Sequence, residues 1–172
     1  MKKICFLMLI LFVSLFLFSG CSKNDNIVRI HIRANSNCVQ DQDIKLVVRD
    51  KIIEYITPII AECRNSYQVK CSLDDNIIQI ESIANNVLKE SGFDYESRAE
   101  IRNEYFPSRS YSGEVYPADY YDALIVELGT GKGDNWWCVA YPPLCFVGND
   151  VDGSNIQYRS KLLDMISKFF GD

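Results

Sequence analysis

The chain is 172 residues long and acidic: 18 Lys and Arg stand against 23 Asp and Glu, which gives a formal net charge of −5. A chain of this length is expected to form one domain. Its acidity excludes a nucleic-acid-binding protein and a protein that docks electrostatically on anionic lipid, because both need clustered Lys and Arg.

The first 20 residues have the composition of an export signal. Lys2 and Lys3 precede an apolar run over residues 4–18, and Ser19 and Gly20 supply small residues at a cleavage point. The run is shorter than the roughly 18 to 20 residues that span a bilayer comfortably, which favours a cleaved signal over a lasting transmembrane helix. A small pair followed by Cys21 resembles a bacterial lipoprotein signal, in which the thiol is acylated and becomes the new N-terminus.

We therefore expect a signal peptide over residues 1–20, a tether over residues 21–26 and one globular domain over residues 27–172. Simple secretion and an uncleaved signal anchor are the alternatives. Cleavage removes two basic side chains and no acidic one, so the net charge of the mature chain is about −7. In each case the body lies outside the cytoplasm and close to a membrane, to which a lipid on Cys21 would anchor it.

Residues 27–34 alternate between apolar and polar side chains, and this period of two predicts a half-buried strand. The apolar set is Val28, Ile30 and Ile32, and the polar set is Arg29, His31 and Arg33. A helical period begins near Asp41, and Pro58 is expected to kink or restart that helix. A second helix is expected from Asp74 and Asp75, whose carboxylates can cap it, to Gly92.

The second half of the chain predicts mainly strands. Residues 95–106 alternate again, residues 107–118 form a long loop suited to a working surface, and residues 122–128 form the next strand. A glycine turn then joins that strand to an aromatic strand over residues 136–141, as a hairpin, which Pro142 and Pro143 end. Residues 156–170 are expected to form an amphipathic helix. The order predicts an α+β fold: a small mixed or antiparallel sheet with two helices inserted after the first strand and a C-terminal helix.

The aromatic strand holds both tryptophans of the chain. Because adjacent residues of a strand point to opposite faces, Trp136 and Trp137 cannot both enter one core. One reading is purely structural, with the second ring covering another layer. The other is that one indole faces a partner protein, since Trp is over-represented among interface anchors.

Five cysteines remain after those of the signal and of the lipidation site are set aside. The short-range candidates for disulfides are Cys138 with Cys145 and Cys63 with Cys71, with Cys38 left over; free thiols are the alternative in a reducing compartment. The cysteine spacings do not resemble a zinc site, and His31 is the one histidine of the sequence. We expect neither a metal nor a cofactor.

Two stretches, RIHIRANS with the following DQDIKLVVRD and ALIVELGTGKGDNWWCVAYPPLCFV, resemble the signature blocks of the stage II sporulation protein R family. The resemblance spans about residues 29–147. It implies an exported signalling protein of endospore-forming bacteria, made in the forespore and moved into the space between forespore and mother cell. There such a protein is required for a membrane-embedded peptidase to mature the precursor of the early mother-cell sigma factor.

Two functional hypotheses follow. The first is a non-enzymatic activator that touches the extracytoplasmic part of the peptidase; the residues expected at this contact are Trp136, Trp137, Pro142, Pro143 and Tyr111. The second is a hydrolase or transferase in which Cys138 is the nucleophile, His31 the base and Asn35 the orienting amide. The glycine-rich GTGKG stretch lacks the spacing of a phosphate-binding loop and is expected to be a turn.

Overall fold

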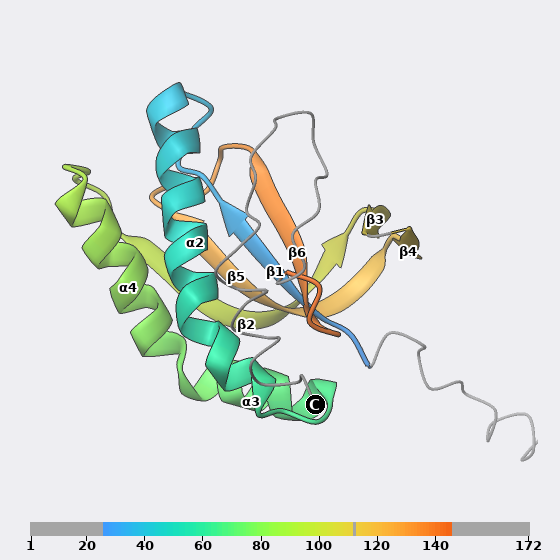
Figure 1. Cartoon of the computed structure of the whole chain (residues 1–172). Coiled ribbons are helices and arrows are strands. Elements are labelled where there is room, and N and C mark those ends of the chain that lie inside the picture. Colours follow the sequence, from blue (N-terminus) through green and yellow to red (C-terminus); the bar gives the residue numbers. More distant parts are fainter. Residues whose placement is uncertain (1–25, 112, 146–172) are drawn as a thin grey trace, which may run out of the picture.

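The computed structural model describes residues 26–111 and 113–145, and the elements follow the chain from blue to orange in Figure 1. Their order is β1 (Val28–Arg33), α2 (Val39–Ala61), α3 (Ser66–Asp75), α4 (Ile77–Glu90), β2 (Ser97–Phe106), β3 (Arg109–Tyr111), β4 (Glu114–Tyr116), β5 (Asp119–Leu128) and β6 (Asn135–Tyr141). The predicted α+β class is confirmed, with three helices rather than two between the first two strands. The expected signal peptide, Cys21 and the helix over residues 156–170 lie outside the described residues.

The main sheet has four strands in the order β2-β5-β1-β6, and β3 and β4 form a separate two-stranded sheet. Strand β1 runs parallel to β5 and antiparallel to β6. The predicted hairpin between the strand over residues 122–128 and the tryptophan strand is therefore wrong. The glycine-rich connection instead crosses the end of β1, where the amide of Gly133 donates a hydrogen bond of 2.8 Å to the carbonyl of Ala34. This crossing places β1 in the middle of the sheet.

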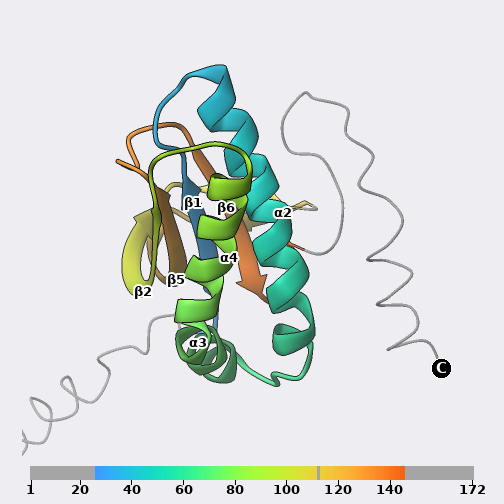
Figure 2. The same cartoon turned by 90° about the vertical axis from the view of Figure 1, so that its left-hand side faces the viewer.

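The three helices cover one face of the sheet, as Figures 1 and 2 show from two sides. Helix α2 buries a stripe that recurs every four residues, including Val48, Ile52 and Ile56, against the apolar side of β1. The expected restart at Pro58 is wrong, because α2 continues to Ala61. Pro58 lies on the exposed side of the last turn of this helix, where water can solvate the carbonyl that loses its donor.

Helix α3 was not predicted as a separate element. Asn65 caps it by accepting from the amide of Gln68 at 2.9 Å, and only Val69 and Leu73 give it a strongly buried side. Asp74 and Asp75 end α3 instead of capping the next helix, whose N-cap is Asn76. The acidic pair is therefore not the predicted N-terminal cap.

The second face of the sheet is also covered, so β1 is not the half-buried strand that its alternation predicts. Arg29 and His31 are 0% and 3% exposed. They lie beside a second apolar cluster of Phe106, Tyr121, Ala123 and Ile125. The region predicted as a loop over residues 107–118 contains the β3–β4 hairpin, whose buried Tyr116 contributes to this cover.

Two loops meet where the parallel strands β1 and β5 end. The side-chain oxygen of Asn35 accepts from the amide of Thr130 at 2.9 Å, and buried Lys45 donates to the carbonyl of Asp134 at 3.0 Å. A Cβ added to Gly133 would lie 2.3 Å from the carbonyl oxygen of Ser36. This backbone approach requires glycine.

We expect Gly133→Ala to lower the free energy of unfolding by about 2–3 kcal/mol, because the added methyl group meets a fixed carbonyl and the crossing loop must shift. Gly92→Ala is the matched control. Gly92 has a φ of +81° and nothing within 4 Å of the added carbon, so only the conformational cost of about 1 kcal/mol applies. Urea denaturation of both variants measures the difference, and equal losses would contradict the proposed close approach.

Candidate functional site

Strand β6 lies at the edge of the four-stranded sheet. Among the strands in the described part of the chain, only β1 pairs with it. Trp136 and Trp137 are both half-buried and point to opposite faces, as expected for neighbours in a strand. Trp136 packs against the helix-side core, whereas Trp137 packs against the second apolar cluster. Neither indole is sealed inside the domain.

A guanidinium group stacks on each indole. Arg109 lies 4.4 Å from the ring centroid of Trp137, and Arg49 lies 5.4 Å from that of Trp136. The ring of His31 is also 5.5 Å from that of Trp137. Trp137 therefore contacts both a cation and an imidazole, and cation–π attraction favours one orientation of its ring.

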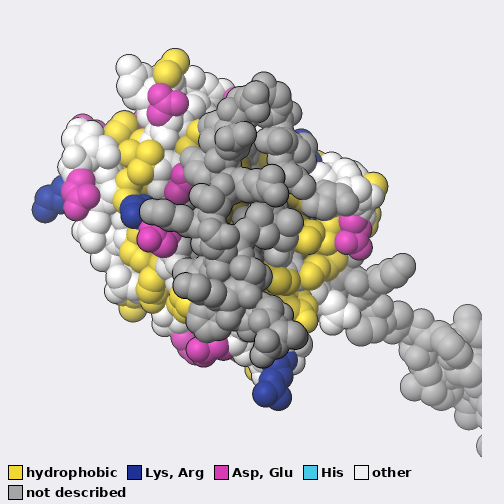
Figure 3. Space-filling model, in the orientation of Figure 1, with side chains coloured by type: hydrophobic (Ala, Val, Ile, Leu, Met, Phe, Trp, Pro, Cys, Tyr) yellow, Lys and Arg dark blue, Asp and Glu magenta, His cyan; other side chains and the backbone are white. Residues whose placement is uncertain are grey.

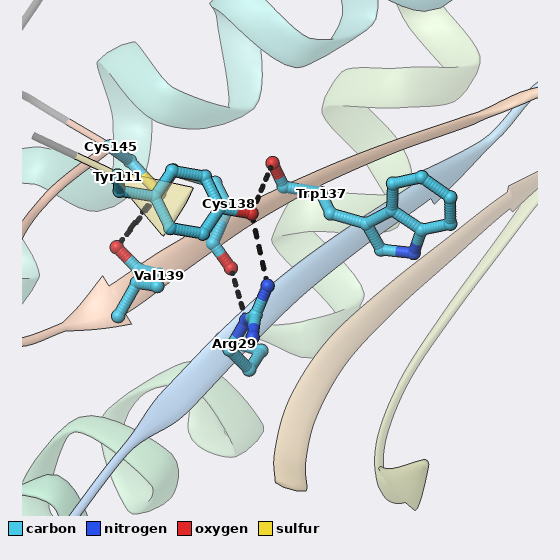
Figure 4. The surroundings of a disulfide bond; sticks show 6 residues. All are labelled: Arg29, Tyr111, Trp137, Cys138, Val139 and Cys145. Atoms are coloured by element: carbon cyan, nitrogen blue, oxygen red, sulfur yellow. Dashed lines mark hydrogen bonds between the residues drawn. A yellow bond between two sulfur atoms is a disulfide. The ribbon is translucent and has the colours of Figure 1, made fainter. Parts of the chain in front are cut away.

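A buried arginine attaches the β3–β4 hairpin to this edge, as Figure 4 shows. The Nε of Arg29 donates to the carbonyl of Cys138 at 3.1 Å, and its Nη2 donates to the hydroxyl of Tyr111 at 3.0 Å. That hydroxyl donates in turn to the carbonyl of Trp137 at 3.3 Å. The guanidinium carbon also lies 4.5 Å from the centroid of Phe106. Four elements of the fold thus meet at one side chain.

Arg29 keeps its charge in this environment. Burial lowers the pKa of its guanidinium, whereas the surrounding tyrosines Tyr111, Tyr121 and Tyr116 raise it. An arginine stays protonated despite such a change. Since no carboxylate within the described ranges forms an ion pair with Arg29, aromatic faces and two neutral acceptors stabilise the charge.

The segment after β6 folds back on the strand. Cys138 and Cys145 form a disulfide with a Cα–Cα distance of 5.7 Å, and the amide of Cys145 donates to the carbonyl of Val139 at 3.2 Å. Pro142 and Pro143 lie exposed in the turn that this bond closes. Cys63 and Cys71, the other candidate pair, are free thiols, as is Cys38.

The structure does not bring together the residues of the enzymatic hypothesis. Along the β1–β6 pairing, His31 is opposite Trp137, whereas Cys138 is opposite Ile30, so the imidazole and the sulfur lie on different faces. Asn35 is in the loop after β1, where its amide donates to Asp41 at 2.9 Å. A cysteine nucleophile needs a base within hydrogen-bond reach, and Cys138 has none here.

His31 instead belongs to a network of charged side chains that sequence analysis did not identify. Its Nδ1 donates to Glu104 at 2.5 Å, and its Nε2 accepts from Arg33 at 3.4 Å, which is the pattern of a neutral imidazole. Arg33 and Arg102 also bind Glu104 and Glu127. The alternation of charged residues along the first two strands is the signal for this network, but a half-buried strand predicts that such side chains face water.

Burial lowers the pKa of His31, although hydrogen bonds to Asn135 and Glu104 oppose this effect. Burial raises the pKa of Glu104, but hydrogen bonds from Arg102 and His31 outweigh it, and the net change is downward. Both changes favour the neutral imidazole and the ionised carboxylate.

No group of three or more His, Cys, Asp and Glu side chains suited to a metal occurs in residues 26–111 and 113–145. In the same residues no helix has the length and apolar character needed to cross a membrane. Where the described side chains are visible in Figure 3, Lys and Arg are scattered and do not gather into a basic patch.

Comparison with known proteins decides the family. Residues 24–151 match the family model described as stage II sporulation protein R. The chain belongs to this family. It is 33% identical over 154 residues to stage II sporulation protein R of Bacillus subtilis (strain 168), an alignment that covers 84% of this chain and 69% of that protein. No solved structure matches the chain. The family predicted from the two signature stretches is therefore confirmed.

We expect the stability of this family member to fall as the pH drops below the ordinary His pKa of about 6.5. In that range the unfolded chain binds a proton that buried His31 does not yet accept, so stability rises with pH there. Glu104 adds a further loss below the ordinary Glu range, because its folded pKa is lowered. Urea denaturation at pH 7.5, 6.5 and 5.5 measures the slope.

His31→Gln is the matched variant, since glutamine retains a donor toward Glu104 but does not titrate. His31 is the one histidine of the chain, so this variant should lose most of the pH dependence between 7.5 and 5.5. An unchanged slope would contradict the burial of a neutral imidazole.

Proposed function

We propose that this chain is an exported sporulation signalling protein. In this role it leaves the forespore, enters the space between the two membranes, and activates a membrane-embedded processing peptidase of the mother cell. The precursor of the early mother-cell sigma factor is then matured. Membership of the stage II sporulation protein R family supports the sporulation role. The signal-like residues 1–20 support export, and a lipid on Cys21 would keep the body at the membrane.

The observation that carries the proposal is a rigid, aromatic sheet edge. The β6 edge surface consists of Trp136, Trp137, Tyr111, Pro142 and Pro143. Trp137 and Tyr111 are held in place by Arg109 and Arg29, so little side-chain entropy is lost when a partner covers them. Half-exposed Trp and Tyr side chains of this kind are frequent anchors of protein interfaces.

An activator of this type works by binding one state of its partner more tightly. The β6 edge surface would contact the extracytoplasmic part of the peptidase and favour its active arrangement. The free energy by which the equilibrium shifts would equal the difference between the binding free energies for the two states. No bond chemistry is needed from this chain. The disulfide at Cys138 and its separation from His31 support a non-enzymatic role.

Trp137→Ala tests this surface. We expect it to reduce processing of the sigma-factor precursor at least about ten-fold, since anchor residues contribute 2 kcal/mol or more to binding. The variant should lower the free energy of unfolding by only about 2 kcal/mol, because the ring is half-buried. Precursor and product are measured by immunoblotting in sporulating cells, beside urea denaturation of the purified chain.

Ile78→Ala is the control. Ile78 is 84% exposed on α4, on the helix side of the molecule, so its removal should change neither processing nor stability. If the precursor is processed normally in cells with Trp137→Ala, or if a variant elsewhere with an equal loss of stability impairs processing equally, the β6 edge surface is not the contact.

Cys138→Ala and Cys145→Ala separate the activator from the enzyme. Each removes the same disulfide, and we expect each to lower the free energy of unfolding by about 2–3 kcal/mol, the value for a short closed loop. If the chain acts without a thiol, both variants should support equal processing of the precursor by the peptidase. Loss of processing with Cys138→Ala alone, at equal stability, would support the cysteine nucleophile and contradict the proposal.

A further inference from the structure

Three tyrosines are exposed together at one end of the molecule. Tyr67 on α3 is 73% exposed, Tyr120 on β5 is 61% exposed and Tyr105 on β2 is 55% exposed. Tyr105 and Tyr120 are directly opposite across the β2–β5 pairing, with ring centroids 5.6 Å apart. Tyr67 and Tyr120 line the same cavity, which has a volume of about 320 Å³. We call these three residues and their cavity the tyrosine end.

The N-terminal tether enters the fold at the same place. Ile27 and Val28 line the cavity between the tyrosines. Figure 1 shows the start of β1 and helix α3 at the same end of the molecule, away from the start of α2. Residues 21–26 can span at most about 20 Å when fully extended. If Cys21 is acylated, or if the apolar residues 4–18 stay in the bilayer, this end is the part of the domain nearest the membrane.

We propose that the tyrosine end rests in the headgroup layer of the membrane that anchors the chain. Tyrosine suits this layer because its ring is apolar and its hydroxyl remains hydrogen-bonded to water or headgroups. This inference rests on the anchored location given under the proposed function. The inference specifies which face of the domain lies against the membrane, and it identifies the bilayer interface as what covers this surface.

The charges at the tyrosine end argue against an electrostatic contact. Lys70 lines the cavity and pairs with Asp122 at 2.7 Å, and Asp119 also lines it. Among the described residues that line the cavity, one lysine faces two carboxylates, so they offer no excess of positive charge that anionic lipid could attract. The contact should therefore form on neutral phosphatidylcholine and resist salt.

This orientation also determines where the β6 edge surface would lie relative to the membrane. Val28 is opposite Tyr141 in the β1–β6 pairing, so the antiparallel strand ends beside the tether and Pro142 and Pro143 follow there. Trp137 lies four residues back along β6, about 13 Å from that end. The surface would thus rise from the membrane, within reach of the extracytoplasmic part of a membrane-embedded protein.

Depth-dependent fluorescence quenching tests the inference. The full chain carrying Tyr120→Trp is incorporated into phosphatidylcholine vesicles with bromines on the acyl chains, where residues 4–18 retain it without processing. The native indoles give the background, which is measured in the parent chain. Val39→Trp, at a 71%-exposed position at the start of α2, is the matched control at the other end of the domain.

We expect the bromines to quench the emission added at position 120 at least about two-fold more than that added at position 39, because interfacial aromatic rings lie at the boundary between headgroups and acyl chains. Adding Tyr67→Ser and Tyr105→Ser should reduce this quenching. High salt should leave it unchanged.

The outcomes distinguish the inference from the proposed function. If the chain does not float with the vesicles in a flotation assay, the anchored location is contradicted and the inference is overturned as well. A chain that floats but shows no extra quenching at position 120 overturns the inference alone. Quenching that requires anionic lipid, or that salt abolishes, overturns it as well, because the contact would then be electrostatic.

Discussion

The buried guanidinium of Arg29 is the interaction on which the second face of this protein depends. A charge removed from water must be compensated, and here the compensation comes from the carbonyl of Cys138, the hydroxyl of Tyr111 and several aromatic faces. Each compensating group belongs to a different strand. The central strand, the edge strand and the small hairpin are therefore fixed relative to one another by a single side chain.

This arrangement explains how a small domain can present tryptophan without losing order. An exposed indole on a mobile loop would lose entropy on binding, whereas Trp137 is already in contact with Arg109 and His31. His31 is in turn oriented by Glu104, which Arg33 and Arg102 also bind. The disulfide between Cys138 and Cys145 folds the following turn onto the same strand. Rigidity is thus concentrated along β6, where a partner would bind.

Much of the fold could be predicted from local pattern. The strand over residues 27–34, the start of the long helix near Asp41 and the strand that holds both tryptophans all appear in the structure close to their expected bounds. The class of fold follows from their order. Helix α3 could not be predicted in this way, because Val69 and Leu73 are too few apolar positions to establish a period.

The larger errors concern pairing and burial, which local pattern does not determine. A glycine turn between two apolar strands predicts a hairpin, but β1 inserts between β5 and β6 through contacts that are distant in sequence. Likewise, the alternating charges of β1 suggest a solvated face, whereas hydrogen bonds and aromatic rings bury it. The tryptophans could be singled out from sequence. Their supports, Arg29, Arg109 and Glu104, could not, because each acts across strands.

Site-specific photo-crosslinking tests the central claim most directly, namely that the edge of β6 contacts the processing peptidase. A benzophenone amino acid replaces exposed Pro143 beside β6, or exposed Ile78 on α4, and sporulating cells are irradiated. The account predicts an adduct that contains the peptidase from position 143 and none from position 78. Absence of the adduct at position 143, or adducts of equal yield at both positions, would contradict it.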